Sequence, residues 1–210
     1  TSCETILTEN GYELEPGADL GVIDLYAAMG TPKNLVGQSL EFVNMSGENL
    51  YGIMMYDANF PNANIYTIDL FQRTKAEDLD ILKEERVHWL KSDSMSAGLP
   101  MSMKDKWGDV KFDFVIDDGG HWPMANLLTF RNCYPKMTED GTYFIEDVWP
   151  MELMSFSELK HPWLVNDPER YSVLENNQFV SEINKHNTVK RYDNRKVTGC
   201  GDSYIIAVSD

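Results

Sequence analysis

The sequence predicts an α/β fold with a doubly wound, mostly parallel sheet of seven strands and an antiparallel last strand. Apolar or β-branched runs alternate with polar or helix-forming sequence at residues 39–45, 64–70, 86–92, 112–118 and 142–148. Such alternation is typical of βα units that build a parallel sheet. Two late apolar segments, 187–193 and 203–208, are joined by glycine-containing sequence. We therefore expect them to form an antiparallel pair that closes the sheet.

Acidic residues recur at the spacing that βα units require. Starting from Glu41, the residues Asp69, Asp93 and Asp117 follow at intervals of 28, 24 and 24 residues. Each interval fits a strand, a crossover helix and a return loop. Each acid is therefore expected near the carboxyl end of a strand, the edge at which open α/β sheets bind ligands.

Helix signals lie between several of these runs. We expect helices over residues 22–29, 48–58, 76–84 and 123–135. The last is the best marked, because Pro123 suits a first helical turn and apolar side chains recur up to the next proline. Prolines punctuate residues 149–186, for which we expect an insertion of loops and helices.

Length and composition predict a single domain, 1–210, that begins with an N-terminal helical segment over residues 1–35. The chain has 210 residues, and 42% of them are hydrophobic. Domains commonly contain roughly 100–200 residues, and this apolar fraction supplies a sizeable core. The composition excludes global disorder.

The charge of the chain disfavours nucleic acid and anionic membranes as partners. The 18 Lys and Arg residues against 34 Asp and Glu give a net charge of −16, which repels phosphate backbones and anionic membranes. The longest apolar stretch, residues 50–56, is too short to span a bilayer, and the first residues lack a signal-peptide pattern. Three cysteines without a CxxC pair favour reduced thiols. We expect a soluble, cytoplasmic protein that binds neither nucleic acid nor membrane.

The most informative segment, residues 115–123 (VIDDGGHWP), joins a strand to a helix. If the strand before it neighbours the next one, Asp118 converges with Glu146 and Asp147 at one edge of the sheet. Three carboxylates this close would raise one another's pKa unless a cation neutralised them. Oxygen ligands favour Mg²⁺, with Mn²⁺ or Ca²⁺ as alternatives. The alternative is that these acids cap loops and helix N-termini.

His121 follows Asp118 by three residues. Because a free imidazole titrates near pH 6.5, His121 can accept a proton from a hydroxyl held on the metal. The competing interpretation is a structural histidine that caps the helix. Asp69 lies where nucleoside-binding α/β domains place an acid on the ribose hydroxyls, and Asp93 is a candidate contact for the adenine amine. Asp is also common in βα loops.

Three motifs resemble those of class I S-adenosylmethionine-dependent methyltransferases. The closest likeness is to the metal-dependent sugar O-methyltransferases of macrolide biosynthesis and to cephalosporin-hydroxylase-like proteins. Residues 59–65 (NFPNANI), followed by Ile68–Asp69, resemble the family's FPNA-I-GID segment. Residues 117–121 (DDGGH) resemble IDDGSH, and residues 145–147 (IED) match the family's IED motif.

The resemblance implies a Rossmann-like fold, S-adenosylmethionine as methyl donor, and Mg²⁺ or Mn²⁺ held by Asp118, Glu146 and Asp147. His121 would be the general base. The implied donor-binding residues are Glu41, Gly47, Asp69, Asp93, Ser94 and Asp117. Residues 149–186 would lie near the active site. The acceptor would be a hydroxyl on a small molecule or saccharide, and a homo-oligomer is left open.

Two departures from the family pattern keep other functions open. Val43 and Glu48 replace glycines in the stretch that resembles the family's LEIGVxxGGSL. A Cβ at position 43 obstructs close approach of the donor. One alternative is therefore a donor-deficient, non-catalytic relative that binds a nucleoside or sugar. A second is a hydroxylase or hydrolase on the same fold, since histidine and carboxylates also hold Fe²⁺.

Overall fold

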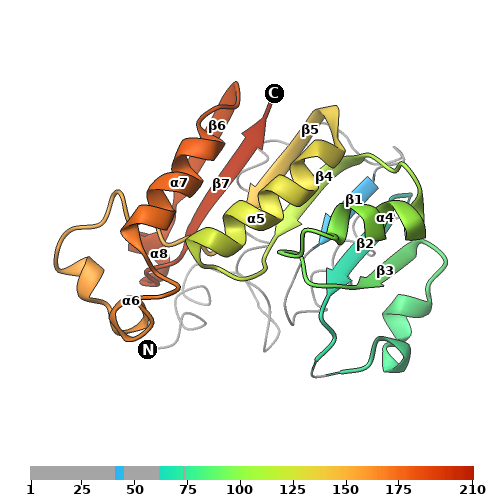
Figure 1. Ribbon diagram of the computed structural model, residues 1–210, viewed down its shortest axis with the longest axis horizontal. Coiled ribbons are helices and arrows are strands. Elements are labelled where there is room, and N and C mark those ends of the chain that lie inside the picture. The colour runs from blue at the N-terminus through green and yellow to red at the C-terminus, as the bar shows by residue number, and fades with distance from the viewer. Residues whose placement is uncertain (1–40, 45–61, 73) are drawn as a thin grey trace.

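The computed structural model describes residues 41–44, 62–72 and 74–210, and Figure 1 shows the sheet at their centre. Within these residues, seven strands pair in the order β3-β2-β1-β4-β5-β7-β6. The strands are β1 Glu41–Asn44, β2 Asn64–Asp69, β3 Val87–Lys91, β4 Phe112–Asp117, β5 Met137–Ile145, β6 Thr188–Asp193 and β7 Tyr204–Ser209.

The strand directions agree with the predicted α/β class. Strands β1 to β5 pair in parallel with one another. Strand β7 runs antiparallel to both β5 and β6, which confirms the antiparallel last strand. Strand β1 lies between β2 and β4, so the strand order changes direction at its two sides. Open α/β sheets bind ligands at such a switch point.

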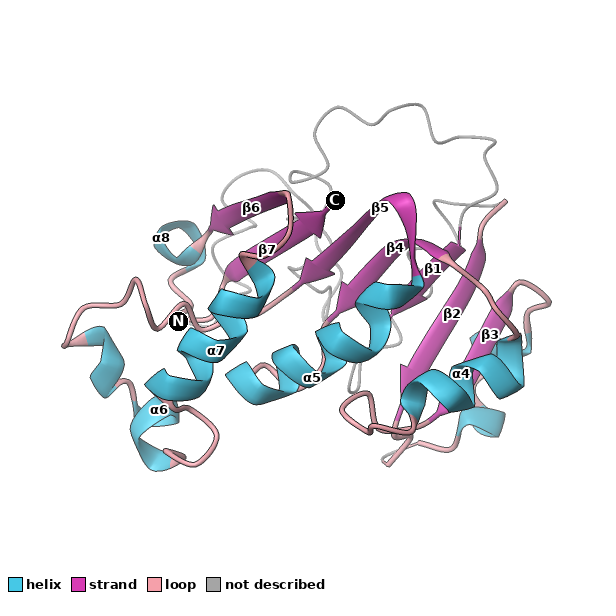
Figure 2. Cartoon of the chain, turned by 45° about the horizontal axis from the view of Figure 1, so that its top comes forward, coloured by secondary structure: helices cyan, strands magenta, loops and turns pink. Residues whose placement is uncertain are grey.

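Helices α4, α5 and α7 lie over one face of the sheet, as Figure 2 shows. The α-helices are α4 Leu99–Trp107, α5 Pro123–Cys133, α6 Pro162–Asn166, α7 Val173–Ile183 and α8 Arg195–Thr198. The 3-10 helices are η1 Ala76–Asp78, η2 Asp80–Lys83, η3 Tyr134–Lys136 and η4 Glu158–Lys160. The best-marked predicted helix, at 123–135, is confirmed by α5 and η3.

Other predicted elements differ in detail. The helix expected at 76–84 is two short 3-10 segments, because Leu79 between them has an extended backbone (φ −102°, ψ 113°). The sequence did not predict α4, whose buried side chains are only Leu99 and Met103. The helices expected at 22–29 and 48–58 lie outside the described residues.

The core has a layer on each face of the sheet. Alternate residues of a strand point to opposite faces. Val115 and Tyr143 accordingly belong to the layer under the helices, whereas Phe144 belongs to the layer on the opposite face. Phe179 and Ile183 of α7 are fully buried in the first layer. The later half of the 149–186 segment therefore contributes to the core.

The cysteine prediction was wrong in part. Cys133 is a buried free thiol, but Cys200 is disulfide-bonded. Among the helices of the described residues, none combines the length and the apolar character that a bilayer crossing needs.

Candidate functional site

The carboxyl ends of β4 and β5 lie side by side. Asp117 pairs with Ile145 at the end of the parallel ladder. One residue further, the backbone N–H of Glu146 donates to the carbonyl oxygen of Asp117 (3.0 Å). The two strands are therefore neighbours, as predicted, and the acids that follow them share one edge of the sheet.

A cluster of three side chains occupies this edge. Asp118, His121 and Asp147 each offer one ligand atom, and these atoms all lie within 4.8 Å of one another. The Nε2 atom of His121 is 3.7 Å from Oδ1 of Asp118. All three residues are half-buried, so the cluster combines partial shielding with access to solvent. Two carboxylates and an imidazole at this spacing are suited to hold a divalent cation.

The backbone that presents this cluster is unusual. Three non-glycine residues of the described chain have positive φ angles: Phe71 (46°), His121 (50°) and Asp147 (49°). Each lies just beyond the carboxyl end of a strand, β2, β4 or β5. The left-handed conformation costs an ordinary residue roughly 1–2 kcal/mol. Such strain is typical of functional sites, where surrounding structure holds a side chain in place.

Tight packing fixes the turn between β4 and α5. A Cβ atom on Gly120 would lie 2.5 Å from Cβ of Ala125 and 2.9 Å from Cζ3 of Trp122. Trp122 is the extended N-cap residue of α5, and Pro123 follows it in the first turn. The guanidinium of Arg170 lies over the Trp122 ring, 4.7 Å from its centroid. The segment before α7 thus contacts the turn that carries His121.

Glu146 and Asp117 lie deeper than the cluster. Glu146, predicted as a third metal ligand, is 3% exposed and is not one of the three clustered residues. Asp117 is 1% exposed, and the hydroxyl of Tyr143 donates to its Oδ2 (3.2 Å). Burial raises the pKa of Asp117 to about 7, partly offset by that hydrogen bond. The pKa of Tyr143 is also raised, mainly by burial. The metal-ligand role of Glu146 and the donor-binding role of Asp117 stay predictions.

The predicted nucleoside contacts lie along the same edge. Asp69 ends β2, and its carboxylate accepts a hydrogen bond from the backbone N–H of Phe71. The carbonyl of Asp69 accepts from the N–H of Ser92 (3.0 Å), just beyond the end of β3. Asp93 Oδ1 accepts from the N–H of Met95 (2.9 Å). Their donor-binding roles are untested, as is that of Ser94.

Two further donor-binding predictions concern Glu41 and Gly47. Glu41 is the first residue of β1 and pairs with Asn64 at the start of β2, so the expectation that it lies near the carboxyl end of a strand was wrong. Gly47 lies outside the described residues.

Sequence reasoning missed the polar contacts of α5. Asn126 and Thr129 are buried, and Asn132, three residues further, is half-buried. Residues three apart share one face of a helix. Thr129 contacts Ser94 through their hydroxyls (3.0 Å). A polar stripe inside an otherwise apolar helix was visible in the sequence and could have indicated this contact.

Comparison with known proteins gives partial matches. No protein-family model matches the sequence. Over 97 residues, 46% of this chain, it is 32% identical to 8-demethyl-8-(2-methoxy-alpha-L-rhamnosyl)-tetracenomycin-C 3'-O-methyltransferase of Streptomyces olivaceus, of which 23% is covered. It is 28% identical over 97 residues to mycinamicin VI 2''-O-methyltransferase of Micromonospora griseorubida, covering 22% of it. The match thus spans less than a quarter of each relative.

Solved structures resemble the whole chain. The MycE methyltransferase of the mycinamycin biosynthetic pathway, in complex with Mg and SAH, aligns with a TM-score of 0.60 at 16% identity, over 100% of this chain and 54% of that one. A putative rRNA methylase from Clostridium thermocellum aligns with a TM-score of 0.58 at 14% identity, over 94% and 97% of the two chains. These likenesses show an α/β methyltransferase fold. With the sequence relatives, they confirm the resemblance to sugar O-methyltransferases.

Proposed function

We propose that this chain carries the catalytic site of a metal-dependent, S-adenosylmethionine-dependent O-methyltransferase that acts on a hydroxyl of a sugar or another small molecule. The observation that carries the proposal is the Asp118–His121–Asp147 cluster at the joined ends of β4 and β5. Its members come from the two motifs that resemble the methyltransferase family. The sequence relatives methylate sugar-bearing compounds by name, which supports a saccharide acceptor.

The donor set fits a hard divalent cation. Asp118 and Asp147 supply carboxylate oxygens, the ligand type that Mg²⁺ and Mn²⁺ prefer. We propose them as ligands, and Glu146, which is buried and is not one of the clustered residues, remains the predicted third ligand. Bound Mg²⁺ would lower the pKa of an acceptor hydroxyl.

His121 is the proposed general base. Its Nε2 lies 3.7 Å from a carboxylate oxygen of Asp118, so a hydroxyl held by a cation on Asp118 would be close to the imidazole. Its left-handed backbone conformation directs the ring from a turn rather than from a regular strand or helix. In this role Nε2 accepts the proton of the acceptor hydroxyl, and the resulting oxygen nucleophile takes the methyl group from the donor sulfonium.

Asp69 and Asp93 are the proposed contacts to the donor nucleoside. Asp69 ends β2, Asp93 follows the adjacent strand β3, and β1 on the other side of β2 ends at the switch point of the sheet. Neighbouring strand ends are about 4.8 Å apart, so a donor at β1 and β2 would lie within reach of the cluster at β4 and β5. We also propose that residues 1–210 form one domain, with the 149–186 segment beside the site.

The presence of an imidazole within the cluster favours one second candidate. If His121 is a ligand, the set of one histidine and two carboxylates suits Fe²⁺, and the chain would be a hydroxylase-like enzyme. The two functions differ in the metal they need and in their use of a methyl donor.

Calorimetric titration separates these functions before any acceptor is known. S-adenosylmethionine and S-adenosylhomocysteine are titrated into the protein with and without Mg²⁺. We expect both nucleosides to bind and Mg²⁺ to bind separately. Nucleoside binding without Mg²⁺ binding would indicate a non-catalytic relative. No nucleoside binding, together with tight Fe²⁺ binding, would contradict the methyltransferase proposal.

A further inference from the structure

We propose that Thr129 and Asn132 of α5 act as positioning residues that clamp the loop after β3, residues 92–98, and thereby fix Asp93 and Ser94 for the methyl donor. The clamp is a structural assignment, and its role in donor binding rests on the proposed function. Neither residue belongs to a motif that the sequence resemblance uses. The same helix begins next to His121, so one rigid element serves both halves of the site.

The contacts of Asn132 are directed at the loop backbone. Its Nδ2 donates to the carbonyl oxygens of Ser94 (2.8 Å) and Ser96 (2.9 Å). One side-chain amide thus satisfies two loop carbonyls at once. The hydrogen bond to Ser94 is part-buried and the hydrogen bond to Ser96 is exposed, so the amide ties two points of the loop backbone to α5 and restricts the loop.

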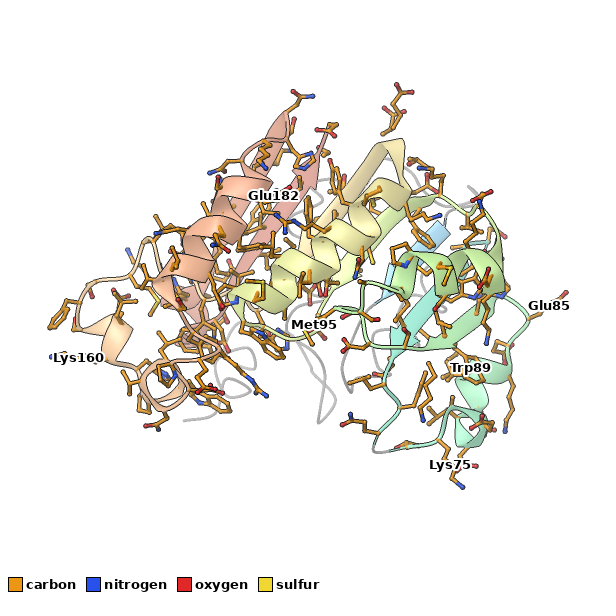
Figure 3. The ribbon with its side chains drawn as sticks, in the orientation of Figure 1. Lys75, Glu85, Trp89, Met95, Lys160 and Glu182 are labelled. Carbon is orange, nitrogen blue, oxygen red and sulfur yellow. The ribbon has the colours of Figure 1, made fainter. Side chains whose placement is uncertain are left out.

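Thr129 supplies the second contact. Its hydroxyl lies 3.0 Å from the Ser94 hydroxyl, and its side chain is fully buried. Thr129 and Asn132 are three residues apart, so both face the loop from one side of α5. Figure 3 labels Met95 of this loop, which lies beside α5.

The loop has an internal structure that the clamp holds in place. Asp93 accepts from the N–H of Met95 through Oδ1 (2.9 Å), and its carbonyl accepts from the N–H of Ser96 (3.1 Å). The N–H of Ser92 is bonded to the carbonyl of Asp69, the other proposed nucleoside contact. The contacts of α5 with Ser94 and Ser96 hold the loop after Asp93, and the hydrogen bond between Ser92 and Asp69 holds it before Asp93. The backbone is therefore fixed on both sides of Asp93.

The helix relates this loop to the metal cluster. Trp122, directly after His121, is seven residues from Thr129, a rise of about 10 Å at 1.5 Å per residue. An α-helix holds that separation with little variation. The clamp thus sets the distance between the donor nucleoside and the proposed base. A loop released from α5 would no longer be held at a fixed distance from His121.

The test combines hydrogen exchange with nucleoside affinity. Thr129→Val removes the hydroxyl at similar volume, Thr129→Ser retains it, and Asn132→Leu removes the amide donor. We expect Thr129→Val and Asn132→Leu to speed amide exchange in residues 93–98. They should also weaken S-adenosylhomocysteine binding by about tenfold, the equivalent of one hydrogen bond. Thr129→Ser should retain most of the slow loop exchange and most of the S-adenosylhomocysteine affinity. The affinity for Mn²⁺ should change by less than about twofold in all three variants.

A matched control separates positioning from general loss of stability. Val180→Ala on α7 removes core packing without touching the loop, and it should not change exchange in residues 93–98 relative to the rest of the chain. Unchanged loop exchange in both Thr129→Val and Asn132→Leu would overturn the clamp, whether or not the affinity for S-adenosylhomocysteine changes. Faster loop exchange with unchanged nucleoside affinity would overturn the positioning role. If the unaltered protein binds no S-adenosylhomocysteine, the proposed function and the positioning role both fail, while the exchange data still decide the clamp.

Discussion

Asp118 and Asp147 reach the candidate metal cluster from two different strand ends, whereas His121 reaches it from the turn before α5. The three groups have different chemistry. A carboxylate oxygen is a good ligand for Mg²⁺ or Mn²⁺, and a neutral imidazole is a better proton acceptor than Mg²⁺ ligand. Their separation into ligands and base is therefore open to a direct test at the level of single residues.

Asp147→Asn should weaken Mn²⁺ binding by roughly tenfold or more, because it removes the charge of a ligand. His121→Ala should leave that affinity within about threefold and should lower turnover by roughly 10²–10⁴-fold. Free Mn²⁺, followed by electron paramagnetic resonance, measures the affinity. Equal loss of Mn²⁺ binding in the two variants would make His121 a ligand and favour the Fe²⁺ alternative. Full activity in EDTA would contradict a metal-dependent mechanism and would favour the alternative that the acids cap loops and helix N-termini.

Gly120→Ala tests the tight turn beside the cluster. The added Cβ would meet Ala125 and Trp122 at distances that require the turn to shift. We expect the free energy of unfolding to fall by about 1–3 kcal/mol, the usual range for overpacking. Urea denaturation measures this. Gly98→Ala is the matched control, because its Cβ would lie 3.6 Å from Oγ of Ser96, an ordinary contact. Equal stability of the two variants would argue against a packed turn.

At the scale of elements, apolar patterning located the strands well, because buried β-branched and aromatic runs are local signals. Strand β5 starts at Met137, five residues before the predicted run, because its first residues are polar and partly exposed. Helix α4 was missed because Leu99 and Met103, its two buried side chains, make too short a pattern to detect. Local sequence carries little information about elements with few buried side chains.

The candidate site was predictable in part for similar reasons. Asp118 and Asp147 follow strands, so parallel neighbours bring them together. Sequence spacing could not separate Glu146 from its neighbour Asp147, because both residues directly follow strand β5 and spacing does not show which carboxylate joins Asp118. Nor could it predict the positive φ angles of His121 and Asp147, because neither position holds a glycine. Those angles depend on the tertiary structure around the turn.

The contact between α5 and α7 provides a test with a pH dependence. Glu182 on α7, labelled in Figure 3, accepts from Arg131 of α5 (3.0 Å) and Lys185 (2.8 Å). The hydrogen bond from Lys185 makes the largest contribution and that from Arg131 the next, and together they lower the pKa of Glu182 below its ordinary value of 4.5. A carboxylate whose pKa is lower in the folded state stabilises that state above its unfolded pKa. The contribution disappears as pH falls through the folded pKa.

Glu182→Gln should therefore lower the free energy of unfolding at pH 7 by about 0.5 kcal/mol, the ordinary size of a partly exposed ion pair. The difference from the unaltered protein should vanish as pH falls below the lowered pKa. Urea denaturation at several pH values measures it. Glu139→Gln, at an exposed position of β5, is the control and should change stability little at any pH. A pH-independent effect of Glu182→Gln would point to packing instead of charge.

At the scale of the whole molecule, fold and charge lead to different expectations about the acceptor. The fold is shared with a putative rRNA methylase over 94% of this chain, so the architecture alone permits an RNA acceptor. The net charge of −16 opposes one, because Lys and Arg side chains bind phosphate backbones by displacing their condensed counterions into solution. Since fold does not fix function, the charge is the more informative property.

A structured RNA should therefore bind the protein no more tightly than about 10⁻⁴ M at low salt, the weak end of ordinary non-specific binding. Fluorescence anisotropy of a labelled RNA hairpin, measured across a series of salt concentrations, tests this, with a basic RNA-binding protein as positive control. A −16 protein lacks the excess of cations that makes RNA affinity fall steeply with salt. Saturable binding with that steep dependence would mean that a local cationic surface overrides the net charge. It would then favour a nucleic acid acceptor over the hydroxyl of a sugar.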